Sequence, residues 1–439
     1  MRQTIFLLAI LCCASPLAAQ EAGRVFRTEV TPYDTRHDAL SHNRVGTPFY
    51  QDFKPAPFLT QGEVTSVGEV VNIPYAWTDG NTYLHLENVG TAYTLLINDK
   101  EVARVEDPAT PADFFISPYI KNGKNALMLD LRKSTVPQLS QGISLSRTPA
   151  FTNSYLYCQN KRSIGDFTIE LVPDSTRKFG ILKIDFLAQN SFNFEETVTV
   201  GYDIYSPQGK LLDFNIVDVV IPGRSVDTVH LHPYIYHTYE NKWEAGKAPL
   251  YKVMLFTRRD GAYKEYIPLQ VGFGKTELID GKLMRLGKQL TLSEVVYNAA
   301  ADRKTTLTEL KALKLKGKNT LRPDYPQPYW FYDLCDELGL YVIDRANINA
   351  PEQRDNRAVG GTPSNDPALR AEYLERVKGM YFRSRNYTCV IGFALGGNSG
   401  NGYNMYKAYQ WLKSVEKSRP VFYVDADGEW NSDTLTGKE

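Results

Sequence analysis

Acidic side chains that could act as a pair gather in the last third of the chain. Asp333, Asp336 and Glu337 fall in one predicted helix, and Asp344 ends the apolar strand that follows. A carboxylic acid and a carboxylate a few ångströms apart can transfer a proton and attack an electrophile. Asp336 and Glu337 lie near a helix end, however, where charged side chains are usually solvated. The pattern therefore favours structural roles for these acids.

Histidines offer a second kind of chemistry. The chain has six, all before its last third: His37, His42, His85, His230, His232 and His237. His230 and His232 would share one face of a strand, where side chains alternate. A metal site needs a third ligand, and none is in view. We therefore predict no metal and no cofactor.

An aromatic cluster opens a predicted helix. It comprises Tyr325, Tyr329, Trp330, Phe331 and Tyr332. Such side chains can form a platform on which a sugar ring stacks. At least half of the cluster must instead be core, because the helix packs on a sheet.

Two β-rich blocks precede these residues. From about 60 to 133, and again from 154 to 274, short alternating runs are broken by turn residues such as Asp79-Gly80-Asn81. Strands joined by tight turns at this spacing predict two antiparallel sandwiches.

The pattern then changes to alternating strands and helices. Strands are predicted at 290–297, 319–322, 340–344, 390–395 and 421–424, and helices at 305–315, 328–338, 366–384 and 403–415. Asp366-Pro367 is a typical helix start. Such alternation predicts right-handed βαβ units around a parallel sheet of five strands.

Composition excludes several classes of protein. Lys+Arg and Asp+Glu are both 50, so the chain has no net charge, which argues against a nucleic-acid partner. An apolar run at 5–14 follows Arg2 and precedes small residues, so residues 1–20 predict an export signal. No later run is long enough to span a membrane, and we expect a periplasmic or cell-surface, outer-membrane-associated protein.

Cysteines give little chemistry. A lipidation motif requires a small residue before the modified Cys, and neither Cys12 nor Cys13 follows one. The motif therefore argues against lipidation of these cysteines without excluding it. The other three, Cys158, Cys335 and Cys389, are widely spaced and contain no Cys-x-x-Cys pair. We expect buried free thiols.

Three sets of segments, in one order, resemble glycoside hydrolase family 2, the group of β-galactosidases, β-glucuronidases and β-mannosidases. The first set is 83–90 (YLHLENVG), 97–102 (INDKEV), 116–120 (ISPYI) and 124–127 (KNAL). The second is Trp243, 249–251 (PLY) and 271–274 (VGFG). The third is 279–282 (IDGK), 334–344 (LCDELGLYVID), Arg385-Asn386, Leu395-Gly396 and 418–421 (SRPV).

The resemblance implies three domains after the signal at 1–20. They are a jelly-roll sugar-binding-like domain at 21–150, an immunoglobulin-like sandwich at 151–274 and a (β/α) barrel at 275–439. The last stretch is shorter than the about 200 residues that a complete eight-stranded barrel needs. We therefore expect an incomplete TIM-type barrel of about five strands, with the strand of the nucleophile missing.

The resemblance also implies that catalytic residues have been lost. Family members place an acid/base Glu in a Gly-Asn-Glu-Ser pattern, and here Gly396-Gly397-Asn398-Ser399 puts Asn398 at that Glu. An amide has no proton to give, although it can bond a sugar hydroxyl. We therefore predict no catalytic residue.

Two other family motifs are altered. The motif Arg-x-x-His-Tyr-Pro becomes Arg322-Pro323-Asp324-Tyr325-Pro326, and matching the magnesium ligands of some members puts Asn349 at the Glu and Pro351 at the His. The candidate binding residues are Asn398, Asn347, Asn349, Arg322, Asp324 and Trp330.

Three functions remain open. The favoured one is an inactive pseudoenzyme that is a binding or structural subunit of an envelope assembly, with a protein partner or second copy covering the open barrel. The others are an active exo-β-glycosidase, β-galactosidase-like, with a rearranged site, and a glycan-binding module.

Overall fold

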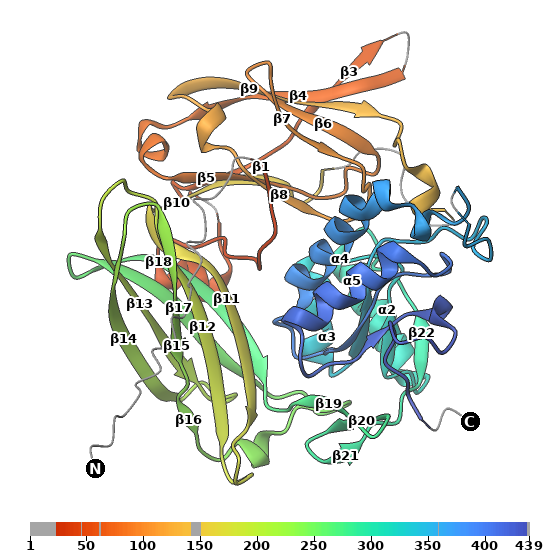
Figure 1. The fold of residues 1–439 in the computed structure, drawn as a ribbon. Coiled ribbons are helices and arrows are strands. Elements are labelled where there is room, and N and C mark those ends of the chain that lie inside the picture. The colour runs from red at the N-terminus through yellow and green to blue at the C-terminus, as the bar shows by residue number, and fades with distance from the viewer. Residues whose placement is uncertain (1–22, 45, 61–62, 142–150, 359, 437–439) are drawn as a thin grey trace, which may run out of the picture.

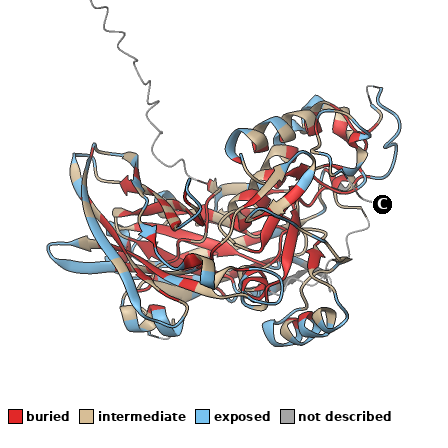
Figure 2. Ribbon diagram, turned by 90° about the horizontal axis from the view of Figure 1, so that it is seen from below, coloured by how far each residue is buried: buried red, intermediate tan, exposed pale blue. Residues whose placement is uncertain are grey.

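The computed structural model describes residues 23–44, 46–60, 63–141, 151–358 and 360–436. The predicted export signal, with Cys12 and Cys13, lies outside these residues. Figure 1 shows two β-sandwiches and one α/β unit. Figure 2 shows that buried residues follow the sheets, whereas exposed ones follow the loops and outer helix faces. Within the described residues, no helix is both long and apolar enough to cross a bilayer.

The first sandwich has two five-stranded sheets around one apolar core. In sheet order, the first comprises β1 (Gly23–Val25), β8 (Ala112–Phe115), β5 (Asn81–Leu86), β10 (Tyr155–Gln159) and β2 (Tyr50–Asp52). The second comprises β3 (Ala56–Thr60), β4 (Glu63–Ile73), β9 (Gly123–Arg132), β6 (Ala92–Ile97) and β7 (Lys100–Val105).

The boundary predicted at residue 150 is wrong. β10 pairs antiparallel with β5 and β2, so the first sandwich extends to Gln159. An alternating run shows that a strand forms but not which of two neighbouring sheets it joins, so the sequence did not place β10.

The second sandwich packs two four-stranded sheets against each other. One comprises β11 (Arg162–Pro173), β12 (Gly180–Asn190), β15 (Ser225–Leu231) and β16 (Tyr234–Ile235). The other comprises β14 (Leu211–Ile221), β13 (Glu196–Tyr205), β17 (Leu250–Arg259) and β18 (Ala262–Gly272). Helix α1 (Arg36–Ser41) also packs on this sandwich, near β18, although its sequence precedes most of the first.

A small antiparallel sheet links the second sandwich to the α/β unit. It comprises β19 (Thr276–Ile279), β20 (Lys282–Arg285) and β21 (Lys288–Gln289). The predicted strand at 290–297 is shorter than expected, because Leu290 bonds back to Leu283 and the parallel strand begins only at Glu294.

The α/β unit contains five described parallel strands in chain order. They are β22 (Glu294–Val296), β23 (Thr320–Arg322), β24 (Tyr341–Arg345), β25 (Val390–Ala394) and β26 (Val421–Phe422). The connecting helices are α2 (Arg303–Leu315), α3 (Tyr329–Leu338), α4 (Arg370–Ser384) and α5 (Tyr403–Val415). The predicted alternation is therefore confirmed.

Local sequence explains where these helices begin and end. Asp302 caps α2 by accepting the backbone N–H of Thr305 at 2.8 Å. Gly339 ends α3 with φ of 65°, a left-handed conformation that favours glycine. Asp366 caps only a short 3-10 turn by accepting the N–H of Ala368, and α4 begins at Arg370, later than predicted.

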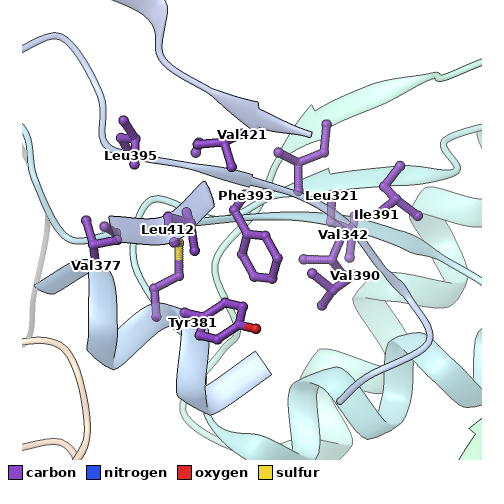
Figure 3. Packing of buried hydrophobic residues seen from close by; sticks show 14 of the residues in the cluster. Leu321, Val342, Val377, Tyr381, Val390, Ile391, Phe393, Leu395, Leu412 and Val421 are labelled. Carbon is purple, nitrogen blue, oxygen red and sulfur yellow. The ribbon is translucent and has the colours of Figure 1, made fainter. Parts of the chain in front are cut away.

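Apolar side chains of the sheet and helices form one continuous core. Figure 3 shows Phe393 of β25 pointing toward Tyr381 of α4, and their ring centroids are 5.5 Å apart. All three described cysteines, Cys158, Cys335 and Cys389, are free and buried, as predicted.

Candidate functional site

The candidate site is the edge where the five parallel strands end. Loops at the carboxyl ends of such strands are the usual place for ligands in α/β folds. The residues that follow the strands there are Asn298, Asp324, Asn347, Asn349, Asn398 and Asp425. Asn298 and Asp425 were not among the predicted site residues, although their places after strands would have identified them.

The side chain of Asn398 is exposed. Its loop follows β25 and is fastened to the chain after β24, since Gly397 donates to the carbonyl of Ile348 at 2.7 Å and Ala350 donates to that of Asn398 at 3.0 Å. On the other side, Asp425 accepts the backbone N–H groups of Ser399 and Gly400 at 2.7 and 2.8 Å. The amide of Asn398 is thus presented to solvent by a well-bonded backbone.

Asn349 lies directly against this loop. A Cβ atom on Gly397 would be only 2.4 Å from the Oδ1 of Asn349. The other end of that amide donates to the carbonyl of Gln141, 2.5 Å away. Half-buried Asn349 therefore lies beside the residue that precedes Asn398.

Asn347 was predicted to bind a ligand, but it lies buried between two domains. Its side chain is fully buried and donates to the Oδ1 of Asp107, in the first sandwich, at 2.5 Å. Buried Arg376 donates to the carbonyl of Asn347 at 2.6 Å and to that of Leu139 at 3.3 Å. Burial alone would raise the pKa of Asp107, but Arg376 and the bond from Asn347 lower it below its usual value. Asn347 thus joins two domains, and its burial gives a ligand no access.

Asp324 is held on several sides. Arg345 pairs with its carboxylate at 2.5 Å, and Asn298 donates to it at 2.9 Å. Its backbone N–H donates to the Oδ1 of Asn298 at 2.8 Å. Burial lowers the pKa of Arg345, and neighbouring Arg322 lowers it further, against the opposing effect of Asp324. Arg322 itself pairs with Glu294 at 3.0 Å. Arg322 and Asp324 are partly exposed at this edge but already have partners.

The aromatic cluster divides as expected between core and surface. Phe331 and Tyr332 are fully buried, whereas Trp330 is half-buried and packs against the same core. Tyr329 lies under the guanidinium of Arg383, 3.8 Å from its ring centroid. Tyr325 and Trp330 keep some exposed surface.

Two of the four acids considered for an alternative pair, Asp336 and Asp344, have no access to a substrate. Asp336 is buried and accepts the N–H groups of Cys389 and Thr388 at 2.6 and 3.3 Å. Asp344 is fully buried and accepts the hydroxyl of Tyr332 at 2.9 Å. Burial raises the pKa of Asp336 to about 7 and that of Asp344 to about 6. Both therefore serve the packing of the sheet.

The magnesium site of some family members does not fit here. Asn349, at the position of the Glu ligand, already uses its amide toward Gln141, and exposed Pro351, at the position of the His, has no side-chain donor atom. Hard divalent cations prefer carboxylate oxygens, so we derive no step through this metal.

Comparisons with known proteins agree on the architecture. The family model described as "Glycosyl hydrolases family 2, TIM barrel domain" matches residues 298–437. The β-galactosidase of Streptococcus thermophilus is 27% identical over 371 residues, which cover 79% of this chain and 34% of that protein. The β-galactosidase of Vibrio cholerae is 29% identical over 354 residues, 77% of this chain and 34% of that protein.

Solved structures give the same result for the fold. A β-glucuronidase of Bacteroides uniformis matches 82% of this chain and 46% of its own, with a TM-score of 0.68 and 16% identity. The chain therefore spans about a third of the curated relatives and about half of this solved one.

Proposed function

The chain is a member of glycoside hydrolase family 2, and from this premise we propose that it binds a glycan at the strand-end edge without cleaving it. The observation behind the proposal is Asn398, an exposed amide at the position of the family's acid/base Glu.

Hydrolysis with retention needs one carboxylic acid to protonate the leaving oxygen and a second carboxylate to attack the sugar. Asn398 cannot give a proton. Asp324 is paired with Arg345, and Asp425 accepts two backbone N–H groups and has Arg354 3.7 Å away. Both carboxylates are thus already bonded to groups of the protein and are not free acids beside Asn398.

The same groups suit the binding of sugar hydroxyls. Amides offer both donors and acceptors, and exposed Asn398 supplies them at this edge, beside the partly engaged amides of Asn298 and Asn349. Tyr325 and Trp330 add partly exposed aromatic surface, on which a sugar ring can stack. Since the relatives are named β-galactosidase and β-glucuronidase, terminal β-galactosides and β-glucuronides are the first ligands to test.

Calorimetry with methyl β-galactoside, β-glucuronide and β-mannoside tests binding. We expect one of them to bind, with affinity at least about fivefold weaker for Asn398→Ala, because one well-placed hydrogen bond is worth about 1 kcal/mol or more. Asn122→Ala changes an exposed asparagine of the first sandwich and serves as the matched control. Absence of binding to all three, or equal affinity in both variants, would contradict the proposal.

An active β-glycosidase is the second candidate, and the match to the family's catalytic domain favours it. Dinitrophenyl glycosides distinguish the two, because their leaving group departs without a proton. If the chain retains a nucleophile, it should hydrolyse dinitrophenyl glycosides but not nitrophenyl glycosides. The Asn398→Glu variant should then also hydrolyse nitrophenyl glycosides. Such a result would replace the proposal, whereas no turnover of either substrate supports it.

We further propose that the chain is exported and that a protein partner, or a second copy, covers the outer strands of the parallel sheet. In the described part of the chain, β22 and β26 each pair on one side only. Val296 and Val424, at or just beyond their ends, are 63% and 61% exposed. Unpaired strand edges favour association. Light scattering that finds a lone monomer at all concentrations would argue against a second copy.

A further inference from the structure

A cluster of three potential metal ligands lies on the second sandwich, outside the strand-end edge. The Oδ1 of Asp185 is 2.7 Å from the Nδ1 of His230 and 2.9 Å from the Nε2 of His232. One ligand atom from each side chain lies within 4.8 Å of both others. Figure 1 shows β12 and β15, which position the cluster, side by side.

Strand geometry brings these residues together. His230 is in β15 and His232 follows it, so their side chains lie on one face. Asp185 of β12 is the direct cross-strand partner of His230. The sequence predicted that the two histidines share one face of a strand. It did not identify the third ligand, Asp185, which lies 45 positions before His230 and comes next to it through strand pairing.

A neighbouring strand also orients the carboxylate. Thr168 of β11 is the cross-strand partner of Asp185, and its hydroxyl donates to the Oδ2 at 3.4 Å. This leaves the Oδ1 directed at both imidazoles. Groups that hold a ligand in this way usually raise the affinity of a metal site.

Two imidazoles and one carboxylate suit zinc and similar transition metals better than magnesium or calcium. Zinc–ligand bonds are about 2.0–2.2 Å long, so ligand atoms in a tetrahedral site lie roughly 3.4 Å apart. The two hydrogen-bonded pairs are slightly closer, and the three ligand atoms all lie within 4.8 Å of one another, so side-chain rotations can bring them to this spacing. The side chains of His230 and His232 are 62% and 42% exposed, which leaves room for a water as the fourth ligand.

We propose that Asp185, His230 and His232 bind one divalent transition-metal ion, with Zn²⁺ as the probe. On binding, the proton that each ligating nitrogen now shares with the Asp185 carboxylate exchanges through solvent to the other ring nitrogen, so the neutral imidazole offers its lone pair to the metal. The ion would link β12 to the end of β15 and stabilise the outer sheet. This proposal is independent of glycan binding, since none of its residues lies at the strand-end edge.

The test is calorimetric titration of the tag-free full chain with ZnCl₂ and, separately, MgCl₂. We expect one equivalent of Zn²⁺, no heat from Mg²⁺ and a higher melting temperature with Zn²⁺. His232→Gln and Asp185→Asn should each weaken Zn²⁺ binding at least about tenfold. His237→Gln is the matched control, because exposed His237 bonds with Glu240, at 3.1 Å, and lies outside the cluster.

Cobalt(II) gives a second readout that does not depend on stability. Its visible absorption should show nitrogen ligands in the native chain and in His237→Gln, but not in His232→Gln. Circular dichroism verifies that each variant is folded. Absence of Zn²⁺ binding, or binding that both cluster variants leave unchanged, would overturn the proposal.

Discussion

The loop that carries Asn398 needs a residue without a side chain at position 397. Gly397 is closely opposed by the amide oxygen of Asn349, whose other end is fixed by Gln141. Any side chain at 397 must displace that amide.

Gly397→Ala should therefore destabilise the protein by about 1–3 kcal/mol, the usual cost of overpacking. Urea denaturation measures the change. In an Asn349→Ala background the same substitution should cost much less, because the opposing oxygen is gone. An equal cost in both backgrounds would show that the contact with Asn349 does not limit this position.

Asn347→Asp tests the buried junction with Asp107. The new carboxylate would face an existing one in a fully buried place, and we expect a loss of about 3 kcal/mol or more. Asn347→Asp combined with Asp107→Asn restores one amide and one carboxylate. The pair should recover most of the stability, measured by thermal unfolding, whereas no recovery would contradict the role of this bond.

At the scale of elements, Trp243 connects the second sandwich to α3. Its fully buried indole donates to the carbonyl of Asp336 at 2.8 Å, and the guanidinium of Arg285 lies 4.9 Å from its ring centroid. Trp243→Phe keeps an aromatic ring but leaves that carbonyl without its donor. We expect a loss of about 1–3 kcal/mol in urea denaturation.

Trp430→Phe is the control for this change, because Trp430 is 54% exposed and stacks on Tyr406. It should change stability by less than about 0.5 kcal/mol. Equal losses in the two variants would show that the bond from Trp243 to α3 contributes little.

The elements themselves were largely predictable from sequence. Periods of two and of three to four residues gave the strands, the helices and their order, because they reflect which face is buried. The membership of β10 was not predictable, since a strand's period does not name its partner. Nor were the contacts of Asn349 with Gln141 or of His230 with Asp185, because both join segments far apart in sequence.

At the scale of the whole molecule, a buried network of charged side chains joins the first sandwich to the α/β unit. His85 contacts Asp113 at 3.0 Å and Glu87 at 3.3 Å, and Glu87 also pairs with Arg383 of α4. Burial alone would lower the pKa of His85, but Asp113 and Glu87 raise it to about 9. The folded protein therefore holds this proton more tightly than the unfolded chain does.

Stability from His85 should be fully present below about pH 6.5 and lost as pH rises through about 9. Its total is about 3 kcal/mol, since each unit of pKa shift is worth about 1.4 kcal/mol. The stability gap between the native chain and His85→Gln should narrow by that amount from about pH 6 to about pH 10. Burial raises the pKa of Glu265 to about 8, but this affects both proteins and cancels in the gap.

Urea denaturation at several pH values measures this difference, and Asn122→Ala, which changes an exposed side chain that does not titrate, is the control. A gap for His85→Gln that stays constant with pH would contradict a charged His85.

The three buried cysteines allow local unfolding of the hydrophobic cores to be followed by thiol labelling. Cys158 lies in the core of the first sandwich, and Cys335 and Cys389 lie in that of the α/β unit. Burial raises the pKa of all three thiols, that of Cys158 to about 12, so an alkylating reagent finds almost no thiolate until a core opens. The order in which these sulfurs are labelled would thus tell which part of the chain unfolds first, with no probe introduced.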